Sequence, residues 1–184
     1  MGRDKALLEL DGRTLAERAA AACHQAGCAT VLTIGGDRHT FEDRGLHALP
    51  DEHPGQGPLG GILTALAAAP ADSMVFVVAV DVPGLSATSI GRVLDALAHD
   101  EAADVAMPRD GTGRRHHLHA AWRQRCRVPL AAAFTRGERA VRRALADLTV
   151  IDVDGIDESS LVDVDTPGEL RQWRRTRGIT DEER

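Results

Sequence analysis

A long run of apolar residues without alternation constrains the fold of this chain more than any other feature. The stretch SMVFVVAVDVPG covers residues 73–84, and its apolar side chains point to both faces of the strand that it predicts. Strands of this kind are typical of parallel sheets, in which helices cover both faces. The run therefore predicts a sheet enclosed between layers of helices.

Segments with helical and strand-like patterns alternate along the rest of the chain. Residues 14–27 have a helical apolar period, with Thr14 as the N-cap, Glu17 three residues later and Gly27 at the end. Thr166 at the cap and Pro167 at the first position begin another helix over 166–177. The remaining patterns predict helices over 61–69, 88–100, 124–135 and 137–146 and a short element near 38–44. They also predict a buried strand over 29–36, strands over 103–108 and 149–154, a polar turn leading into a strand over 110–122, and a weak strand leading into a loop over 45–61. This alternation indicates an α/β domain with a mostly parallel sheet.

The length and composition favour one domain. With 184 residues, 43% of them hydrophobic, the chain can fill one core, and we expect a single domain over 1–178 followed by a frayed tail over 179–184. Aromatic residues make up only 3%, so few side chains are available to stack on nucleic-acid bases. The net charge of −6, with no basic run, further excludes a long nucleic acid as the partner.

The cysteines and the terminal segments indicate a cytoplasmic protein. Cys23, Cys28 and Cys126 lack a metal-ligand spacing and cannot all pair, so we expect reduced thiols, with Cys23 and Cys126 as apolar fillers. The sequence shows neither a secretory signal nor an apolar stretch long enough to cross a membrane.

Acidic residues lie where strands are expected to end. Asp81 closes the apolar run, and ligands of open α/β sheets bind outside the carboxyl ends of the strands. Mg²⁺ takes one or two carboxylates and completes its shell with phosphate and water oxygens. Asp163 and Asp165 are candidates for a second carboxylate, because residues two apart on an extended segment point the same way. Alternatively, Asp81 is a turn residue and Asp165 serves the N-terminus of the last helix.

A glycine-rich loop precedes the predicted helix over 61–69. Glycines in PGQGPLGG, residues 54–61, allow backbone N–H groups to approach a ligand, and a helix beginning near Leu59 adds a partial positive charge. Asp51 lies just before the loop and is a candidate for contacts with a ribose or a base. The alternative is a loop that only turns the chain.

A group of basic residues lies at 114–119. His117 and His119 would share one face of a strand, with His116 beside them, but no third zinc ligand has a recognisable spacing. A solvated or substrate-facing edge is the usual role of such histidines. Arg114 and Arg115 fit either contacts with an anionic substrate or a solvated turn.

Taken in order, these residues resemble the MobA-like nucleotidyltransferase family, the molybdenum cofactor guanylyltransferases and their relatives. The family signature reads LAGGxSxRMGxDKALL and is followed by an Asn/Asp-Gly turn; residues 1–8 match its second half and Asp11-Gly12 match the turn. The resemblance implies a three-layer, Rossmann-like nucleotidyltransferase fold. It also implies that the first strand and the LAGG half of the signature are missing from this sequence.

The resemblance assigns roles to particular positions. Residues 137–139 resemble its AGERxV segment and residues 163–167 its N/D-V-N/D-T-P motif. It implies that Lys5 and Asp81 are catalytic and that Asp81, with Asp163 or Asp165, binds Mg²⁺. The implied nucleotide-binding residues are Lys5, Asp51, Gly57, Pro58, Leu59 and Gly60.

The function implied by the resemblance is transfer of GMP from GTP to the phosphate of a pterin cofactor, with release of pyrophosphate. No tightly bound organic cofactor is expected, and the sequence does not indicate an oligomeric state. Two departures keep alternatives open: Gly35-Gly36 replace an Asn frequent in guanylyl members, and DVDTP also occurs in cytidylyl relatives. These alternatives are a cytidylyl- or sugar-phosphate nucleotidyltransferase, or a truncated, non-catalytic nucleotide-binding domain.

Overall fold

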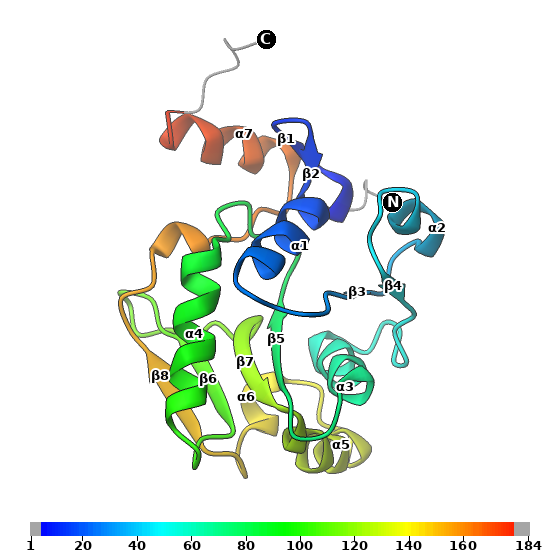
Figure 1. Cartoon of the computed structure of the whole chain (residues 1–184), viewed down its shortest axis with the longest axis vertical. Helices are drawn as coiled ribbons and strands as arrows, with labels where there is room; N and C mark the ends of the chain where they lie inside the picture. The colour runs from blue at the N-terminus through cyan, green and yellow to red at the C-terminus, as the bar shows by residue number, and fades with distance from the viewer. Residues whose placement is uncertain (1–4, 179–184) are drawn as a thin grey trace.

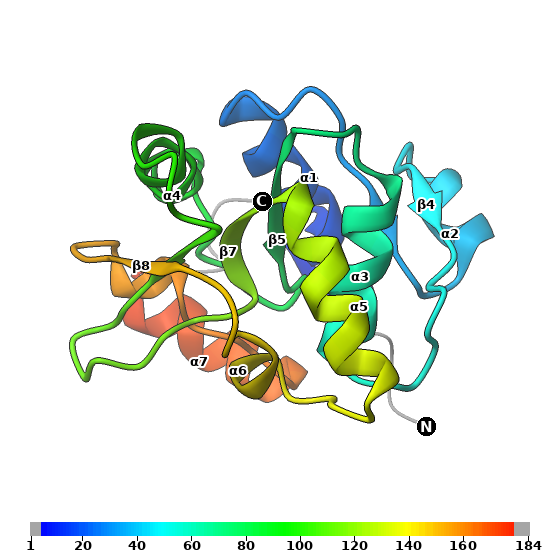
Figure 2. The same cartoon turned by 90° about the horizontal axis from the view of Figure 1, so that it is seen from below.

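The computed structural model describes residues 5–178, in which helices cover both faces of a sheet (Figures 1 and 2). The α-helices are α1 (Leu15–Gln25), α2 (Arg38–Glu42), α3 (Pro58–Ala68), α4 (Ala87–His99), α5 (Arg127–Thr135), α6 (Val141–Ala144) and α7 (Pro167–Thr176). The strands are β1 (Glu9–Leu10), β2 (Arg13–Thr14), β3 (Thr33–Ile34), β4 (Ala48–Leu49), β5 (Met74–Val78), β6 (Val105–Pro108), β7 (His119–Arg123) and β8 (Val150–Val153). Three short 3₁₀ helices, η1 (Lys5–Leu7), η2 (Gln124–Cys126) and η3 (Glu158–Ser160), complete the described elements. The predicted tail over 179–184 and the signature residues 1–4 lie outside the described residues.

The main sheet has four strands in the order β5-β7-β6-β8. Strand β7 is antiparallel to both neighbours, whereas β6 and β8 are parallel, so three of the four strands run in the same direction. A loop without a helix connects β6 to β7, and this reverses the chain because parallel neighbours require a longer crossover. Two smaller pairs lie apart from this sheet: β1-β2 is antiparallel and β3-β4 is parallel.

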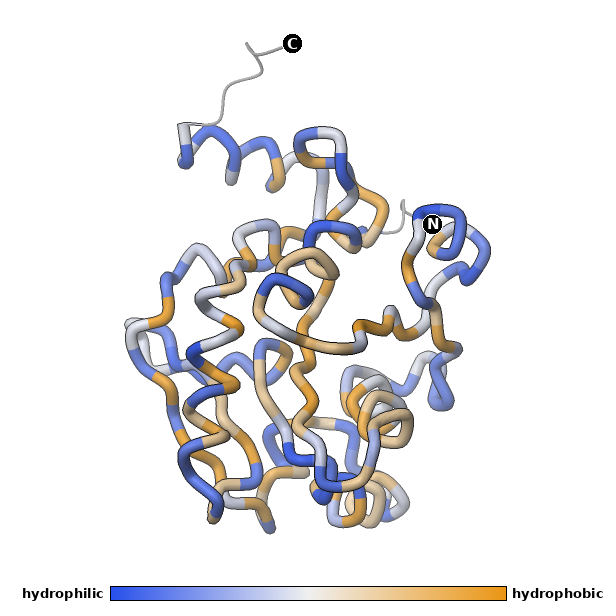
Figure 3. Tube along the Cα trace, in the orientation of Figure 1, coloured by the Kyte–Doolittle hydropathy of each residue, from blue (hydrophilic) through white to orange (hydrophobic). Residues whose placement is uncertain are grey.

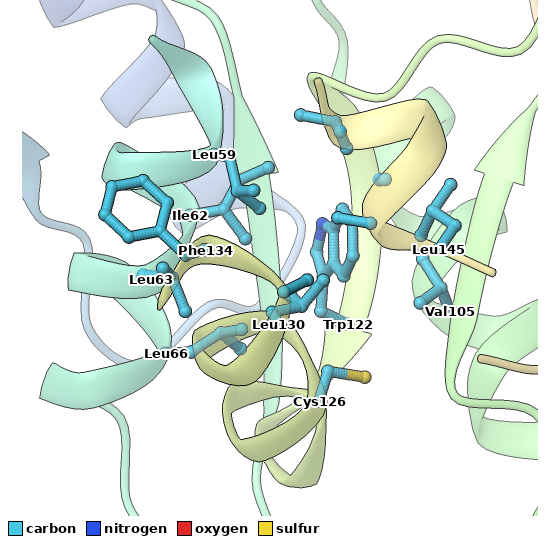
Figure 4. Packing of buried hydrophobic residues seen from close by; sticks show 14 of the residues in the cluster. Leu59, Ile62, Leu63, Leu66, Val105, Trp122, Cys126, Leu130, Phe134 and Leu145 are labelled. Atoms are coloured by element: carbon cyan, nitrogen blue, oxygen red, sulfur yellow. The ribbon is translucent and has the colours of Figure 1, made fainter. Parts of the chain in front are cut away.

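Alternate residues of the strands pack against different helical layers. On β6, Val105 and Met107 contact the cluster formed with α3, α5 and α6, while Ala106 packs with residues of α4 on the other face. Trp122 of β7 is fully buried between the sheet and α5 (Figure 4). These two clusters form the three-layer α/β arrangement that the alternating pattern predicted.

Strand β5 is less buried than its sequence predicts. It is continuously apolar along its length (Figure 3), and residues 75–80 were expected to be covered on both faces, yet all are only half-buried. Both faces are covered as predicted, because Val75 and Val77 pack against one cluster and Phe76 against another, but burial is incomplete because β5 pairs with β7 on one edge and, within the described residues, with no strand on the other. The strand predicted over 29–36 is likewise reduced to β3, and Leu32 is 37% exposed.

The helix ends follow the local sequence signals closely. Thr14 and Glu17 form a reciprocal capping box at α1, and Thr166 caps α7 in the same way with Glu169. Helix α6 is shorter than the predicted 137–146, because the Glu138 carboxylate binds the amides of residues 139 and 140 and keeps them out of the helix. No described helix is both long and apolar enough to span a bilayer.

The three thiols lie in different environments, which predicts an order of reactivity. Cys23 and Cys126 are buried, as expected of fillers, and burial raises the pKa of Cys126 to about 12. Cys28 is half-buried, and a hydrogen bond from Cys23 lowers its pKa to about 7. Because the thiolate is the nucleophile, iodoacetamide at neutral pH should alkylate Cys28 first and leave Cys126 intact in the folded protein. Peptide mass spectrometry checks this order, and equal rates at Cys28 and Cys126 would contradict it.

Candidate active site

Asp81 lies just beyond the end of β5, in the turn that leads to α4. Its side chain is only 17% exposed, and Oδ2 lies 3.4 Å from the Lys5 Nζ. The other oxygen, Oδ1, is buried and has no hydrogen-bond partner in the described residues. Since a buried polar atom without a partner is costly, Oδ1 marks a position where a ligand would be stabilising.

The acidic segment over 163–165 runs beside Asp81. Val164 is buried, and its N–H donates a 2.8 Å hydrogen bond to the Asp81 carbonyl oxygen. Asp163 and Asp165 on either side of it are exposed, as expected of alternate residues on an extended segment. The Lys5 ammonium donates to the Asp165 carboxylate as well as to Asp81, so residues distant in the sequence meet at one point.

The alternative role of Asp165 at the N-terminus of α7 is filled by other groups. The Thr166 side chain caps the helix by accepting from the Glu169 N–H. The Glu169 carboxylate in turn accepts from the backbone N–H groups of Asp165 and Thr166. The Asp165 carboxylate is therefore directed to Lys5 rather than to the helix.

Lys5 is the only lysine in a chain that carries 22 Lys and Arg residues. It lies in η1, and its hydrogen bond to Asp165, followed by that to Asp81, raises its pKa. A lysine ammonium is a compact point charge, whereas a guanidinium is planar and larger. A chain that otherwise uses arginine thus places the smaller cation between these two carboxylates.

The same carboxylates fit a hard divalent cation. No group of three or more acidic, histidine or cysteine side chains in the described part of the chain forms a complete metal cage. Mg²⁺ does not require one, because it usually binds one or two carboxylates together with water and phosphate oxygens. Asp81 Oδ1, which has no hydrogen-bond partner within residues 5–178, and the Asp165 carboxylate are the oxygens that such a cation would contact.

Asp51 organises the glycine-rich loop. Its Oδ1 accepts hydrogen bonds from the His53 N–H at 2.9 Å and the Thr64 hydroxyl at 3.1 Å, which ties the loop to α3. Both bonds involve Oδ1, which leaves Oδ2 for a ligand. Gly35 at the end of β3 faces Asp51, since a Cβ at this glycine would lie 3.7 Å from the Asp51 Cβ.

The loop opens onto the N-terminus of α3. Gly57 is the N-cap with a φ of +80°, which favours glycine, and Pro58 follows at the first helical position. A Cβ at Gly60 would lie 2.8 Å from the His53 Cβ, so this position requires a close approach. Leu59 is fully buried in the core and offers only its backbone to a ligand. The first turn carries no acidic residue, so its N–H groups other than that of Gly60, which donates to the Gly57 carbonyl oxygen, can bind an anion.

Asp81 also lines a cavity of about 1230 Å³. Its lining includes Asp81, Asp163, Arg114, His117 and Arg142, and the glycine-rich loop contributes Pro58. Arg114 and Arg142 form no ion pair within residues 5–178. Arg142 was not predicted from the sequence, although the basic pair at 142–143 next to residues 137–139 is a signal for it.

The basic residues at 114–119 have separate roles. His116 pairs with Asp110 at 3.0 Å, and Arg115 binds Asp152 through two hydrogen bonds of 2.6 and 3.2 Å. His119 lies in β7, and burial lowers its pKa to about 4, so it is neutral near pH 7. Burial also lowers the pKa of His117, which faces the cavity. The described residues thus lend no support to a zinc site here.

Comparisons with known proteins identify the family of this chain. Residues 1–151 match the family model of the MobA-like NTP transferase domain. The chain is 34% identical to a molybdenum cofactor guanylyltransferase of Xanthomonas euvesicatoria, over 95% of this chain and 86% of that protein. It is 30% identical to a probable molybdenum cofactor guanylyltransferase of Chloroflexus aggregans, over 98% and 90%.

Solved structures share the fold. Molybdopterin-guanine dinucleotide biosynthesis protein A of Archaeoglobus fulgidus superposes with a TM-score of 0.74 at 19% identity, covering 97% of this chain and 93% of that one. The 2-C-methyl-D-erythritol 4-phosphate cytidylyltransferase of Thermus thermophilus gives 0.71 at 22%, covering 95% and 94%. At these identities the likeness establishes the Rossmann-like nucleotidyltransferase fold, with a mixed sheet between helices.

Proposed function

This chain belongs to the MobA-like NTP transferase domain family, and on that premise we propose that it transfers GMP from GTP to the phosphate of a pterin acceptor. The relatives named molybdenum cofactor guanylyltransferase support the choice of nucleotide and acceptor, because they match most of the chain. One structural observation carries the proposal: Lys5, Asp81 and Asp165 meet at one point, and Asp81 also lines a large cavity to which the glycine-rich loop contributes Pro58. The proposal places the reaction in the cytoplasm, where GTP is available.

The nucleotide binds at the glycine-rich loop over 54–61. The N–H groups at the start of α3 and the Lys5 ammonium bind the triphosphate, and the free Asp51 oxygen accepts from the nucleoside. Backbone groups of Gly57, Leu59 and Gly60 form the wall of this subsite, with Pro58 fixing the first turn.

The acceptor binds in the cavity that Asp81 lines. Its size suits an organic acceptor larger than a single phosphate. Arg114 and Arg142, which lack a carboxylate partner in the described residues, hold the anionic groups of the acceptor against the site.

The reaction exchanges one phosphate bond for another. An oxygen of the acceptor phosphate attacks the α-phosphorus of GTP, and the bond from that phosphorus to the β-phosphate oxygen breaks, so pyrophosphate leaves with the electron pair. Lys5 offsets the charge that gathers on the leaving group. Asp81, with Asp165 or Asp163, would hold Mg²⁺, which when bound neutralises phosphate charge. The protein contributes mainly orientation and charge complementarity.

A substrate panel tests the proposal. The protein is incubated with Mg²⁺, one of GTP, CTP, ATP or UTP, and either a phosphorylated pterin or a sugar phosphate, and pyrophosphate release is measured. We expect release to require both GTP and the pterin, and to stop when EDTA removes the divalent cation.

Other outcomes identify the alternatives. Release with CTP, or with a sugar phosphate, would contradict the guanylyl assignment and favour the corresponding relatives. Nucleotide binding by calorimetry without release under any pairing would indicate a non-catalytic nucleotide-binding domain.

A further inference from the structure

The loop after Asp81 and the segment before Asp163 touch through their backbones at Gly84. A Cβ at this glycine would lie 2.8 Å from the Ser159 carbonyl carbon, closer still to its oxygen, and 3.2 Å from the Trp173 ring. Real side chains essentially never make such contacts with backbone atoms, which cannot turn aside as a flexible side chain can. The two segments can approach this closely only because residue 84 has no side chain.

Ser160, on the other segment, stabilises the same contact. Its side chain is almost completely buried, with the residue 1% exposed, and its hydroxyl donates a 2.8 Å hydrogen bond to the Gly84 carbonyl oxygen. The Ser160 hydroxyl also lies 3.4 Å from that of Ser86, the N-cap of α4. Removing the hydroxyl leaves the half-buried Gly84 carbonyl with one partner fewer.

The contact between Gly84 and Ser160 lies three residues away from the acidic residues of the site on each segment. Gly84 follows Asp81 by three residues, Ser160 precedes Asp163 by three, and the bond from Val164 to Asp81 joins the segments again at the site itself. We propose that Gly84 and Ser160 are positioning residues that hold the acidic segment over 163–165 at the distance from Asp81 that catalysis requires. This inference rests on the proposed function.

An effect on catalysis is expected because the reaction rate depends steeply on the positions of the reacting groups. A shift of about 1 Å in a reacting group can cost on the order of a hundredfold in rate, even when its cause lies away from the chemistry. A methyl group at residue 84 has to displace the backbone at Ser159, which is joined to Asp163 by only three intervening residues. The glycine-rich loop belongs to a different part of the chain and is not displaced with it.

Two matched pairs of variants test the proposal in the full chain. Gly84→Ala is compared with Gly91→Ala, because Gly91 lies in α4 and a Cβ there has nothing within 4 Å. Ser160→Ala is compared with Ser159→Ala. The measurements are the exchange rate of the Val164 amide, kcat and KM for GTP, and the thermal unfolding temperature.

Gly84→Ala should speed exchange of the Val164 amide by at least about tenfold, because the bond to Asp81 opens more often. Amides of β6 and β7 should keep their wild-type rates. kcat should fall by on the order of a hundredfold, while KM for GTP stays within about twofold. Ser160→Ala should change the same quantities in the same direction by a smaller factor, and both control variants should behave as wild type.

Two other results would contradict the inference. Unchanged Val164 exchange in Gly84→Ala would show that the segments are not held together there. Faster exchange with normal kcat would show that the position of the acidic segment does not matter for catalysis. If wild-type protein transfers no nucleotide to any acceptor, the proposed function fails by itself, and the exchange data still report whether the contact exists.

Discussion

Asp81→Asn is expected to lower kcat for nucleotidyl transfer by at least about a hundredfold, equivalent to about 3 kcal/mol of transition-state stabilisation. The substitution keeps the shape of the side chain and removes its charge. It also leaves intact the bond from Val164, which goes to the backbone carbonyl of residue 81. The loss is therefore chemical, because Oδ1, which has no hydrogen-bond partner within residues 5–178, no longer offers a charged oxygen to a cation over the phosphates.

A matched acidic residue serves as the control. Asp95 is exposed on α4, away from the site, so Asp95→Asn should retain wild-type kcat. Steady-state pyrophosphate release and thermal unfolding are measured on both variants. Normal Mg²⁺-dependent turnover in a folded Asp81→Asn protein would remove Asp81 from the proposed mechanism.

The convergence of this site could be predicted because it depends on two local rules. The end of an apolar strand placed Asp81 at the sheet edge, and the period of an extended segment placed Asp163 and Asp165 on one side of it. Which of the two carboxylates contacts Lys5 could not be predicted, because both satisfy the same period. It depends on Lys5, which contacts Asp165 through a fold that the spacing alone does not reveal.

Features of the fold that depend on local sequence signals were predicted, whereas those that depend on contacts between distant segments were not. Capping residues fixed the ends of α1 and α7 because their hydrogen bonds span only three residues. The burial of β5 was overestimated because apolar content does not show whether a neighbouring strand is present. The direction of β7 was also not predicted, since it follows from the short connection after β6.

The contact at Gly84 could not be predicted from the sequence. A Pro-Gly pair after a strand usually indicates only a turn, and nothing near it points to Ser159. The requirement for glycine comes from a backbone 75 residues further on. Such close approaches are visible only once the segments are packed together.

Replacing Lys5 is expected to have an effect of similar size to that of Asp81→Asn. Lys5→Met should lower kcat by on the order of a hundredfold, because the leaving pyrophosphate loses its compensating charge. Lys5→Arg should also lose at least about tenfold even though the charge is kept, since a planar guanidinium does not fit the place of a compact ammonium between two carboxylates. Steady-state kinetics on both variants measures these losses, and full activity of Lys5→Arg would show that charge alone is sufficient.

Chemical modification provides an independent measurement, because Lys5 is the only lysine in the chain. An amine-acylating reagent can then modify only Lys5 and the terminal amine, so acylation should inactivate the protein and bound GTP should protect it. The Lys5→Arg variant, which keeps the terminal amine, should lose none of its remaining activity on the same treatment. Hydrogen bonds from Lys5 to Asp165 and Asp81 raise the pKa of the ammonium and slow its acylation, so Asp165→Asn should speed labelling. Labelling that is no faster in Asp165→Asn would mean that the two side chains do not interact in solution.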